Sequence, residues 1–176
     1  MKKILTQFIL CIAAALFFAS TANAQYYTGV GVRLGKFASG VSFKYFFDAN
    51  NASAIELIAA KTKTAKGGYV VTGLYECQTP ITMPILQLPL DFIAGVGAHV
   101  GYYPKRYYKI VEGSAVYYND NCVAVGIDAL IALEYDVPLV WLPFAVGIEA
   151  QPFLELVNRG PEFLDFAVTL KYVFNE

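Results

Sequence analysis

The stretch Leu164–Phe174 reads LDFAVTLKYVF, and its two faces differ in polarity. Successive side chains of a β-strand point to opposite faces, so every second residue shares a face. One face is apolar throughout: Leu164, Phe166, Val168, Leu170, Tyr172 and Phe174. The other face is mostly small or polar: Asp165, Ala167, Thr169, Lys171 and Val173. This alternation is typical of a strand with one face in lipid and the other in a barrel lumen.

The same period of two recurs along the chain. It predicts further strands at about residues 26–35, 40–47, 52–61, 69–78, 90–103, 122–135 and 142–154. Together with the last segment they make an even number of strands, as single-chain bacterial barrels require. The predicted fold class is all-β: an eight-stranded antiparallel up-and-down transmembrane β-barrel. Long external loops would alternate with inner turns at residues 48–51, 79–89 and 136–141.

The composition also favours a membrane protein. Hydrophobic residues make up 57% of the chain and charged residues only 15%, against about 25% charged in ordinary soluble domains. The apolar segment at residues 79–90 contains Pro80, Pro84 and Pro89, which break helices. Lipid admits only helices or closed barrels, because every backbone polar group must be satisfied there. With helices disfavoured, the barrel remains.

The N-terminal residues predict export. Lys2 and Lys3 precede an apolar run at residues 9–18, and Ala22-Asn23-Ala24 matches a signal-peptidase site. The run is shorter than the roughly 20 residues that span a bilayer as a helix. We therefore expect a cleavable signal peptide at residues 1–24 and a barrel domain at residues 25–176 in the outer membrane of a Gram-negative bacterium.

Aromatic residues near the strand ends predict two girdles at the membrane interfaces. The expected periplasmic girdle is Tyr26, Phe47, Tyr75, Phe92, Tyr135, Trp141, Tyr172 and Phe174. The expected external girdle is Phe37, Tyr69, Tyr102 and Phe166. Cys77 and Cys122 would lie at opposite ends of the barrel, farther apart than the ~7 Å between Cα atoms that a disulfide allows, so we expect no bond between them.

Three strings add a family resemblance: GVGAHVGY at residues 95–102, GIDA at 126–129 running on to LEY at 133–135, and LKYVF at 170–174. They resemble the small outer-membrane β-barrel proteins common in Bacteroidota, which are related in architecture to OmpX and the OmpA membrane domain. The resemblance implies a fold and a location but no reaction. Its terminal aromatic strand resembles the signal read by the barrel-assembly machinery, and the implied surroundings are outer-membrane lipid and lipopolysaccharide.

Charged residues on the inward faces predict a polar network that fills the lumen. Buried charges are expected to pair, because an isolated buried charge is costly. The predicted members are Arg33, Lys44, Glu56, Glu76, His99, Asp128, Glu134, Glu149 and Lys171. Asp128 is the expected partner of His99. A proton or ion path through these residues is the functional alternative.

The long loop at residues 104–121 is the candidate surface for recognition. It mixes basic and aromatic residues: Lys105, Arg106, Tyr107, Tyr108, Tyr117 and Tyr118. Such a composition suits binding of an extracellular protein or glycan, and it equally suits a loop that lies on lipopolysaccharide headgroups.

No pattern in the sequence predicts catalysis, a cofactor or a metal. The single histidine cannot build a zinc cluster, and a net charge of −1 gives no footprint for nucleic acid. We therefore predict a non-enzymatic outer-membrane barrel with a structural or surface-interaction role. Two alternatives stay open: an outer-membrane lipid-modifying enzyme, which a histidine or serine at the outer rim would favour, and a soluble periplasmic lipocalin-like barrel, which needs the opposite polarity inside and outside.

Overall fold

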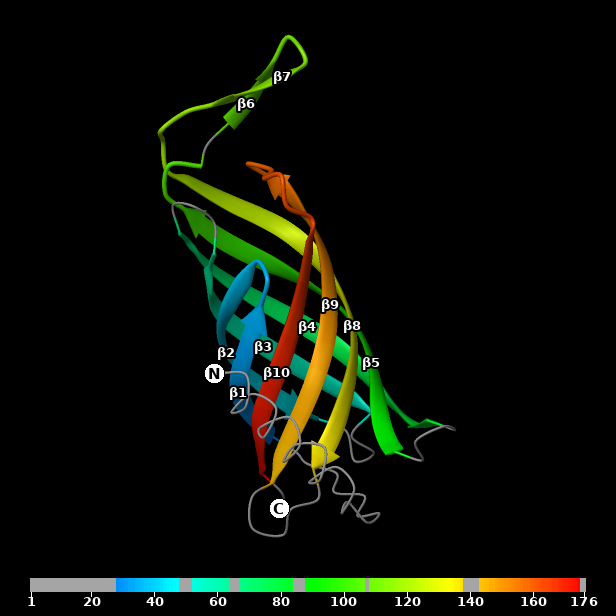
Figure 1. The fold of residues 1–176 in the computed structure, drawn as a ribbon. Helices are drawn as coiled ribbons and strands as arrows, with labels where there is room; N and C mark the ends of the chain where they lie inside the picture. The colour runs from blue at the N-terminus through cyan, green and yellow to red at the C-terminus, as the bar shows by residue number, and fades with distance from the viewer. Residues whose placement is uncertain are drawn as a thin grey trace, which may run out of the picture.

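The computed structural model describes residues 28–47, 52–63, 67–83, 88–106, 108–137 and 143–174. Its main body is a closed β-barrel of eight antiparallel strands, in the order β1-β10-β9-β8-β5-β4-β3-β2 (Figure 1). The barrel strands are β1 (Thr28–Gly35), β2 (Ala38–Phe46), β3 (Ser53–Thr62), β4 (Tyr69–Met83), β5 (Leu88–Tyr103), β8 (Cys122–Val137), β9 (Phe144–Val157) and β10 (Leu164–Phe174). The predicted fold class is confirmed. The predicted signal peptide, residues 1–24, lies outside the described residues.

Pairing of the first and last strands closes the barrel. Thr28 lies opposite Phe174, and Gly35 lies opposite Ala167. The turns at this terminal end connect β2 to β3, β4 to β5 and β8 to β9. The loops at the other end include the longest connection, which joins β5 to β8. Because barrels of this kind have short periplasmic turns and longer extracellular loops, we name the end away from the chain termini the external end.

The structure contains a hairpin that the sequence pattern did not predict. Within the long connection, β6 (Tyr108–Val111) pairs with β7 (Ser114–Tyr117) and projects beyond the barrel (Figure 1). Glu112 and Gly113 form the two-residue turn, with φ of 51° and 80°. A tight turn with positive φ at both positions matches the right-handed twist of a hairpin and favours glycine.

The expected long inner turn at residues 79–89 is wrong. β4 continues to Met83 and β5 already begins at Leu88, and these segments pair with each other. Pro80 and Pro89 are tolerated because the paired ends of β4 and β5 extend beyond the strands beside them. β3 stops pairing with β4 at Cys77, and β8 joins β5 only from Asp91. Among the described residues, each extension therefore has one edge without a strand partner, where a residue without an N–H costs no ladder hydrogen bond.

The barrel is apolar outside, and its interior holds both polar and apolar side chains. Large apolar side chains on the outward faces are exposed, among them Val96 at 63% and Leu34 at 62%, whereas Lys44 is 0% exposed. Part of the lumen lining, contributed by β2, β3, β4, β5 and β8, is apolar. It carries Ala38, Ile58, Ala60, Val70, Leu74, Ile93, Leu130 and Ala132. Among the described residues, no helix is long and apolar enough to cross a membrane.

Most of the aromatic residues expected in the girdles do face outward. Those with exposed side chains are Phe47, Tyr69, Tyr75, Phe92, Tyr102, Phe166, Tyr172 and Phe174. Two expectations are wrong: Phe37 packs inward against the core, with its ring 5.2 Å from that of Phe153, and Tyr135 is only 6% exposed. Phe37 turns inward because it lies in the tight β1–β2 turn, where strand alternation no longer sets direction. Tyr26 and Trp141 lie outside the described residues.

Candidate functional site

All the charged residues predicted for the lumen are buried inside the barrel. Their side chains project from the inward faces of all eight barrel strands, and the members are Arg33, Lys44, Glu56, Glu76, His99, Asp128, Glu134, Glu149 and Lys171. They form two groups along the barrel axis. One surrounds the two lysines toward the terminal end, and the other surrounds the arginine toward the external end.

The lysine group is centred on Glu134, which lies between two ammonium groups. Lys171 Nζ lies 3.0 Å from Glu134 Oε2 and 3.2 Å from a carboxylate oxygen of Glu56. Lys44 Nζ lies 3.0 Å from Glu76 Oε2 and 3.8 Å from Glu134 Oε1. These ion pairs join β2, β3, β4, β8 and β10 across the lumen. Because both lysines are fully buried, the carboxylates replace the water that would otherwise solvate them.

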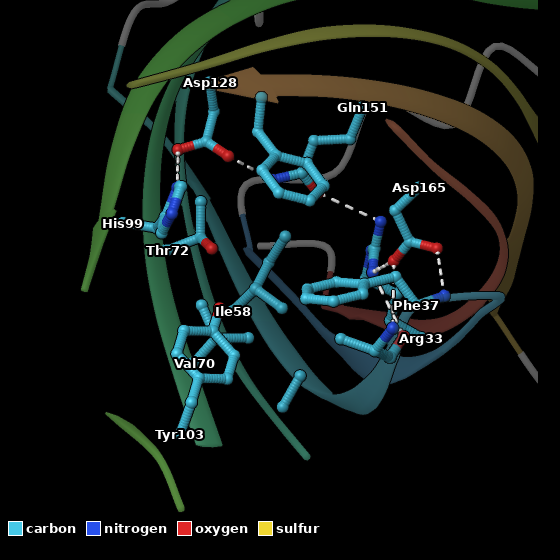
Figure 2. A pocket seen from close by; sticks show the side chains of 13 residues that line it. Arg33, Phe37, Ile58, Val70, Thr72, His99, Tyr103, Asp128, Gln151 and Asp165 are labelled. Carbon is cyan, nitrogen blue, oxygen red and sulfur yellow. Dashed lines mark hydrogen bonds and ion pairs between the residues drawn. The ribbon is translucent and has the colours of Figure 1, made fainter. Parts of the chain in front are cut away.

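The arginine group is a chain of polar contacts that ends at the histidine (Figure 2). The Arg33 guanidinium donates to Glu149, to Asp165 Oδ2 at 2.7 Å and to Gln151 Oε1 at 3.0 Å. The amide nitrogen of Gln151 then donates to Asp128 Oδ1 at 2.8 Å. Asp128 Oδ2 lies 2.8 Å from Nδ1 of His99, so the expected partners are in contact.

Sequence reasoning left two members of this group out of the network. Asp165 also accepts the backbone N–H of Phe37 at 2.6 Å and thereby fixes the β1–β2 turn. It lies on the inward face of β10 with Lys171, and Gln151 lies on the inward face of β9 with Glu149. The alternation therefore placed both correctly. The alternation did not predict that both side chains contact Arg33.

Beside this group the lumen narrows to a small cavity of about 20 Å³. His99, Asp128 and Gln151 form its polar wall, and Ile58 and Val70 belong to its apolar wall (Figure 2). Such a volume holds on the order of one water molecule. The side chains that line this cavity are therefore closely packed.

An arginine from the long loop packs against the external end of the barrel. Arg106 lies against Glu155, with nitrogen–oxygen distances of 3.0 and 2.8 Å, and its guanidinium carbon lies 3.8 Å from the centre of the Tyr103 ring. Burial opposes its charge, but hydrogen bonding and attraction to Glu155 outweigh burial and raise the Arg106 pKa above its usual value. Glu155 also accepts the backbone N–H of Gly160. We call Arg106, Glu155 and Gly160 the mouth latch, because they tie the β5–β6 loop to the β9–β10 loop.

The structure describes some of the other residues of the predicted recognition loop. Lys105 and Tyr118 are exposed, and Tyr108 opposes Tyr117 across the β6–β7 hairpin. Tyr107 lies outside the described residues. Arg106 turns into the mouth and does not join Lys105 on the surface.

The geometry holds neither a metal cluster nor a disulfide in the part of the chain described. No group of three or more His, Cys, Asp and Glu side chains there could hold a metal ion. Cys77 and Cys122 are free. Their cross-strand partners explain why: Cys77 lies opposite Ser53 near the terminal end, and Cys122 lies opposite Tyr103 at the external end.

Together these features define a closed eight-stranded antiparallel β-barrel with an apolar outer wall and ion pairs inside the lumen. Among solved structures, the barrel is similar to the crystal structure of the N-terminal β-barrel domain of Pseudomonas aeruginosa OprF, with a TM-score of 0.61. The match covers 85% of this chain and 100% of that one at 10% sequence identity, a likeness of fold. No protein-family model and no curated protein matches the sequence.

Proposed function

We propose that this chain is an integral outer-membrane protein of a Gram-negative bacterium, a non-enzymatic barrel that acts as a rigid scaffold for its external loops. Its surroundings would be outer-membrane lipid and lipopolysaccharide, and its terminal aromatic strand would be recognised by the barrel-assembly machinery. An extracellular protein or glycan would meet the loop at residues 104–121. Loops on a rigid scaffold are where proteins commonly carry recognition.

The observation that carries the proposal is the reversed polarity of the wall. Ile148 and Phe166 face outward with 59% and 56% of their surface exposed, while Arg33 and Lys171 are only 2% exposed. In water this arrangement would leave a continuous apolar belt unsatisfied, whereas soluble proteins rarely expose apolar patches of more than a few hundred Å². In a bilayer the same belt is the lipid-facing surface of a barrel.

The same polarity argues against a lipocalin-like soluble barrel, which would bury its apolar face around a ligand. The position of His99 argues against a lipid-modifying enzyme. Its ring is 5% exposed, lies within the lumen against Phe153 and contacts Asp128. A group acting on lipid would need to reach the outer rim.

The lumen contacts also bear on the ion-path alternative. A conducting path needs a wet, continuous route, but the charged groups here are paired with one another across the lumen, and the cavity beside them holds about one water molecule. The packing therefore favours a filled barrel over a channel.

The decisive experiment is fractionation combined with heat-modifiable gel mobility. We expect the mature chain to remain with the outer membrane after a high-salt wash and to run faster unheated than boiled, because a folded barrel resists detergent. A chain recovered in the soluble fraction, with one mobility under both conditions, would refute the membrane proposal. In planar bilayers we expect no steady open-pore conductance, and a steady ohmic current would instead favour the ion path.

A further inference from the structure

A groove on the outside of the barrel at the external end combines cationic and apolar side chains. Its volume is about 390 Å³, and it lies where the β1–β2 turn, the end of β3 and the β9–β10 loop meet. Its lining includes Lys36, Lys63, Phe163, Leu164 and Phe166. Phe163 is 65% exposed, so the apolar part of the groove opens to the surroundings of the barrel.

Backbone and side-chain hydrogen bonds hold both lysines at this groove. The backbone N–H of Lys36 donates to Phe166 O at 2.8 Å, and that of Lys63 donates to Phe37 O at 2.7 Å. The Lys63 ammonium also donates to Gly35 O at 2.7 Å. An ammonium has three donors, so this contact orients the group and leaves donors for an anion.

A second hollow lies on the barrel wall on the side of this groove nearer the chain termini, and its lining is apolar apart from Glu149. This hollow measures about 450 Å³ and shares Phe166 with the first. Its apolar lining includes Leu34, Ile131, Ile148 and Val168. Together the two hollows place lysine amines at the external end and apolar side chains along the barrel wall. This arrangement suits a lipid with an anionic headgroup and an acyl chain.

The exposed positive charge of the barrel is gathered at the same end. Among the side chains that the structure describes, the exposed lysines and arginines are Lys36, Lys61, Lys63, Lys105 and Arg159, and all lie at or beyond the external ends of the strands. Basic residues at a membrane surface are attracted to anionic lipid headgroups. This end therefore fits a leaflet rich in phosphate.

We propose that the groove binds the phosphorylated headgroup of an outer-leaflet lipid, the lipid A part of lipopolysaccharide. A phosphate lies between Lys36 and Lys63, and an acyl chain follows Phe166 down the wall. Glu162 also lines the groove, and its carboxylate is 3.5 Å from Arg106, which offsets its repulsion of the phosphate. The inference rests on the proposed membrane location.

Native mass spectrometry of the full chain in detergent tests the proposal with diphosphoryl lipid A as the probe. We expect dephosphorylated lipid A and inorganic phosphate to bind far more weakly, because the site needs both the phosphate and the acyl chain. The Lys36→Gln/Lys63→Gln variant should lose about 25-fold in affinity, since a lysine at an anionic surface contributes about fivefold.

The matched control is Lys61→Gln/Arg159→Gln, which removes the same charge from the same rim but not from the groove lining. We expect the control to lose much less affinity than the groove variant. Equal losses in the two variants, or equal binding of phosphorylated and dephosphorylated lipid, would overturn the proposal.

Heat-modifiable mobility of each variant separates this outcome from a failure of the proposed function. A wild-type chain that is not heat-modifiable and leaves the membrane fraction refutes the membrane location itself. A folded, membrane-bound chain without phosphate preference refutes only the lipid site. If the double variant does not fold, Lys36→Gln alone serves, and an unchanged affinity in that variant counts against the site.

Discussion

The buried lysines show how single residues specify this barrel. Lys171 projects from the middle of the last strand and contacts Glu56 on β3 and Glu134 on β8. Replacing a buried ion pair by apolar residues is often nearly neutral, whereas removing one partner is strongly destabilising, because the remaining charge has no counterpart. The lumen network is therefore sensitive to single substitutions and tolerant of matched ones.

Lys171→Met should consequently destabilise the folded barrel. We expect a loss of about 3–5 kcal/mol in the free energy of unfolding, because Glu134 and Glu56 lose their nearest cation. Urea titration of the protein in lipid vesicles measures this loss, with the folded fraction at each urea concentration determined from gel mobility. The double variant Lys171→Met/Glu134→Gln should recover part of the loss. A double variant as unstable as the two single losses added together would contradict the coupling.

Gly126 on β8 lies opposite His99, the only histidine of the chain. A Cβ on Gly126 would collide with the imidazole ring of His99 and with Leu154 O. We expect Gly126→Ala to cost about 1–3 kcal/mol of stability, as overpacking does, and to shift the His99 imidazole resonances in NMR spectra. Gly73→Ala is the control, because a Cβ there meets nothing within 4 Å. Unchanged imidazole signals in Gly126→Ala would place the ring elsewhere.

Among the elements, regular alternation was predictable and turns were not. β10 matched its predicted ends because its period of two is unbroken, and Lys44 and Glu76 point inward by the same rule. The apolar lining from Ile58 and Leu74 was missed, although both share parity with inward glutamates on their strands. An apolar side chain can face either the outside of the barrel or the lumen, so the residue type alone does not predict which way it points. Contacts between strands, such as that of Arg33 with Asp165, depend on how the strands are aligned with each other. The sequence of one strand does not predict that alignment.

The mouth latch connects two loops, and its loss should free one of them. Arg106→Ala removes the contacts to Glu155 and Tyr103. We expect limited proteolysis to cut within residues 104–121 several times faster, while the barrel itself stays protease-resistant and heat-modifiable. Gly160→Ala should act alike, because its Cβ would overlap the Arg106 guanidinium. Lys105→Ala is the control and should leave the cleavage rate unchanged. Equal rates in Arg106→Ala and the control would mean that the latch does not hold the loop.

At the scale of the whole molecule, the main feature is that apolar side chains face outward and charged side chains face the lumen. The alternation in LDFAVTLKYVF already predicts this arrangement. Outward Val168 and Leu170 are 50% and 44% exposed, and inward Lys171 is 2% exposed. Closure of the sheet, the strand order and the occluded lumen follow from that assignment, because a tilted sheet of this size leaves an interior that side chains just fill. The β6–β7 hairpin does not follow from it, since local turn chemistry at Glu112 and Gly113 produces that element.

A charge scan of the outer wall tests this polarity directly. Val96 lies midway along β5 and is 63% exposed, whereas Val123 is 49% exposed at the external end, opposite Tyr102. In a bilayer, arginine on the lipid face costs about 2–4 kcal/mol at the midplane and about 0–1 kcal/mol near the interface. We therefore expect Val96→Arg to lower the unfolding free energy in vesicles strongly and Val123→Arg to change it little. In water both sites are exposed, so a barrel that is stable without lipid would tolerate the two substitutions equally. The difference in unfolding free energy between the two variants therefore shows whether the outer wall lies in the hydrocarbon of a bilayer. This test does not depend on any ligand or loop.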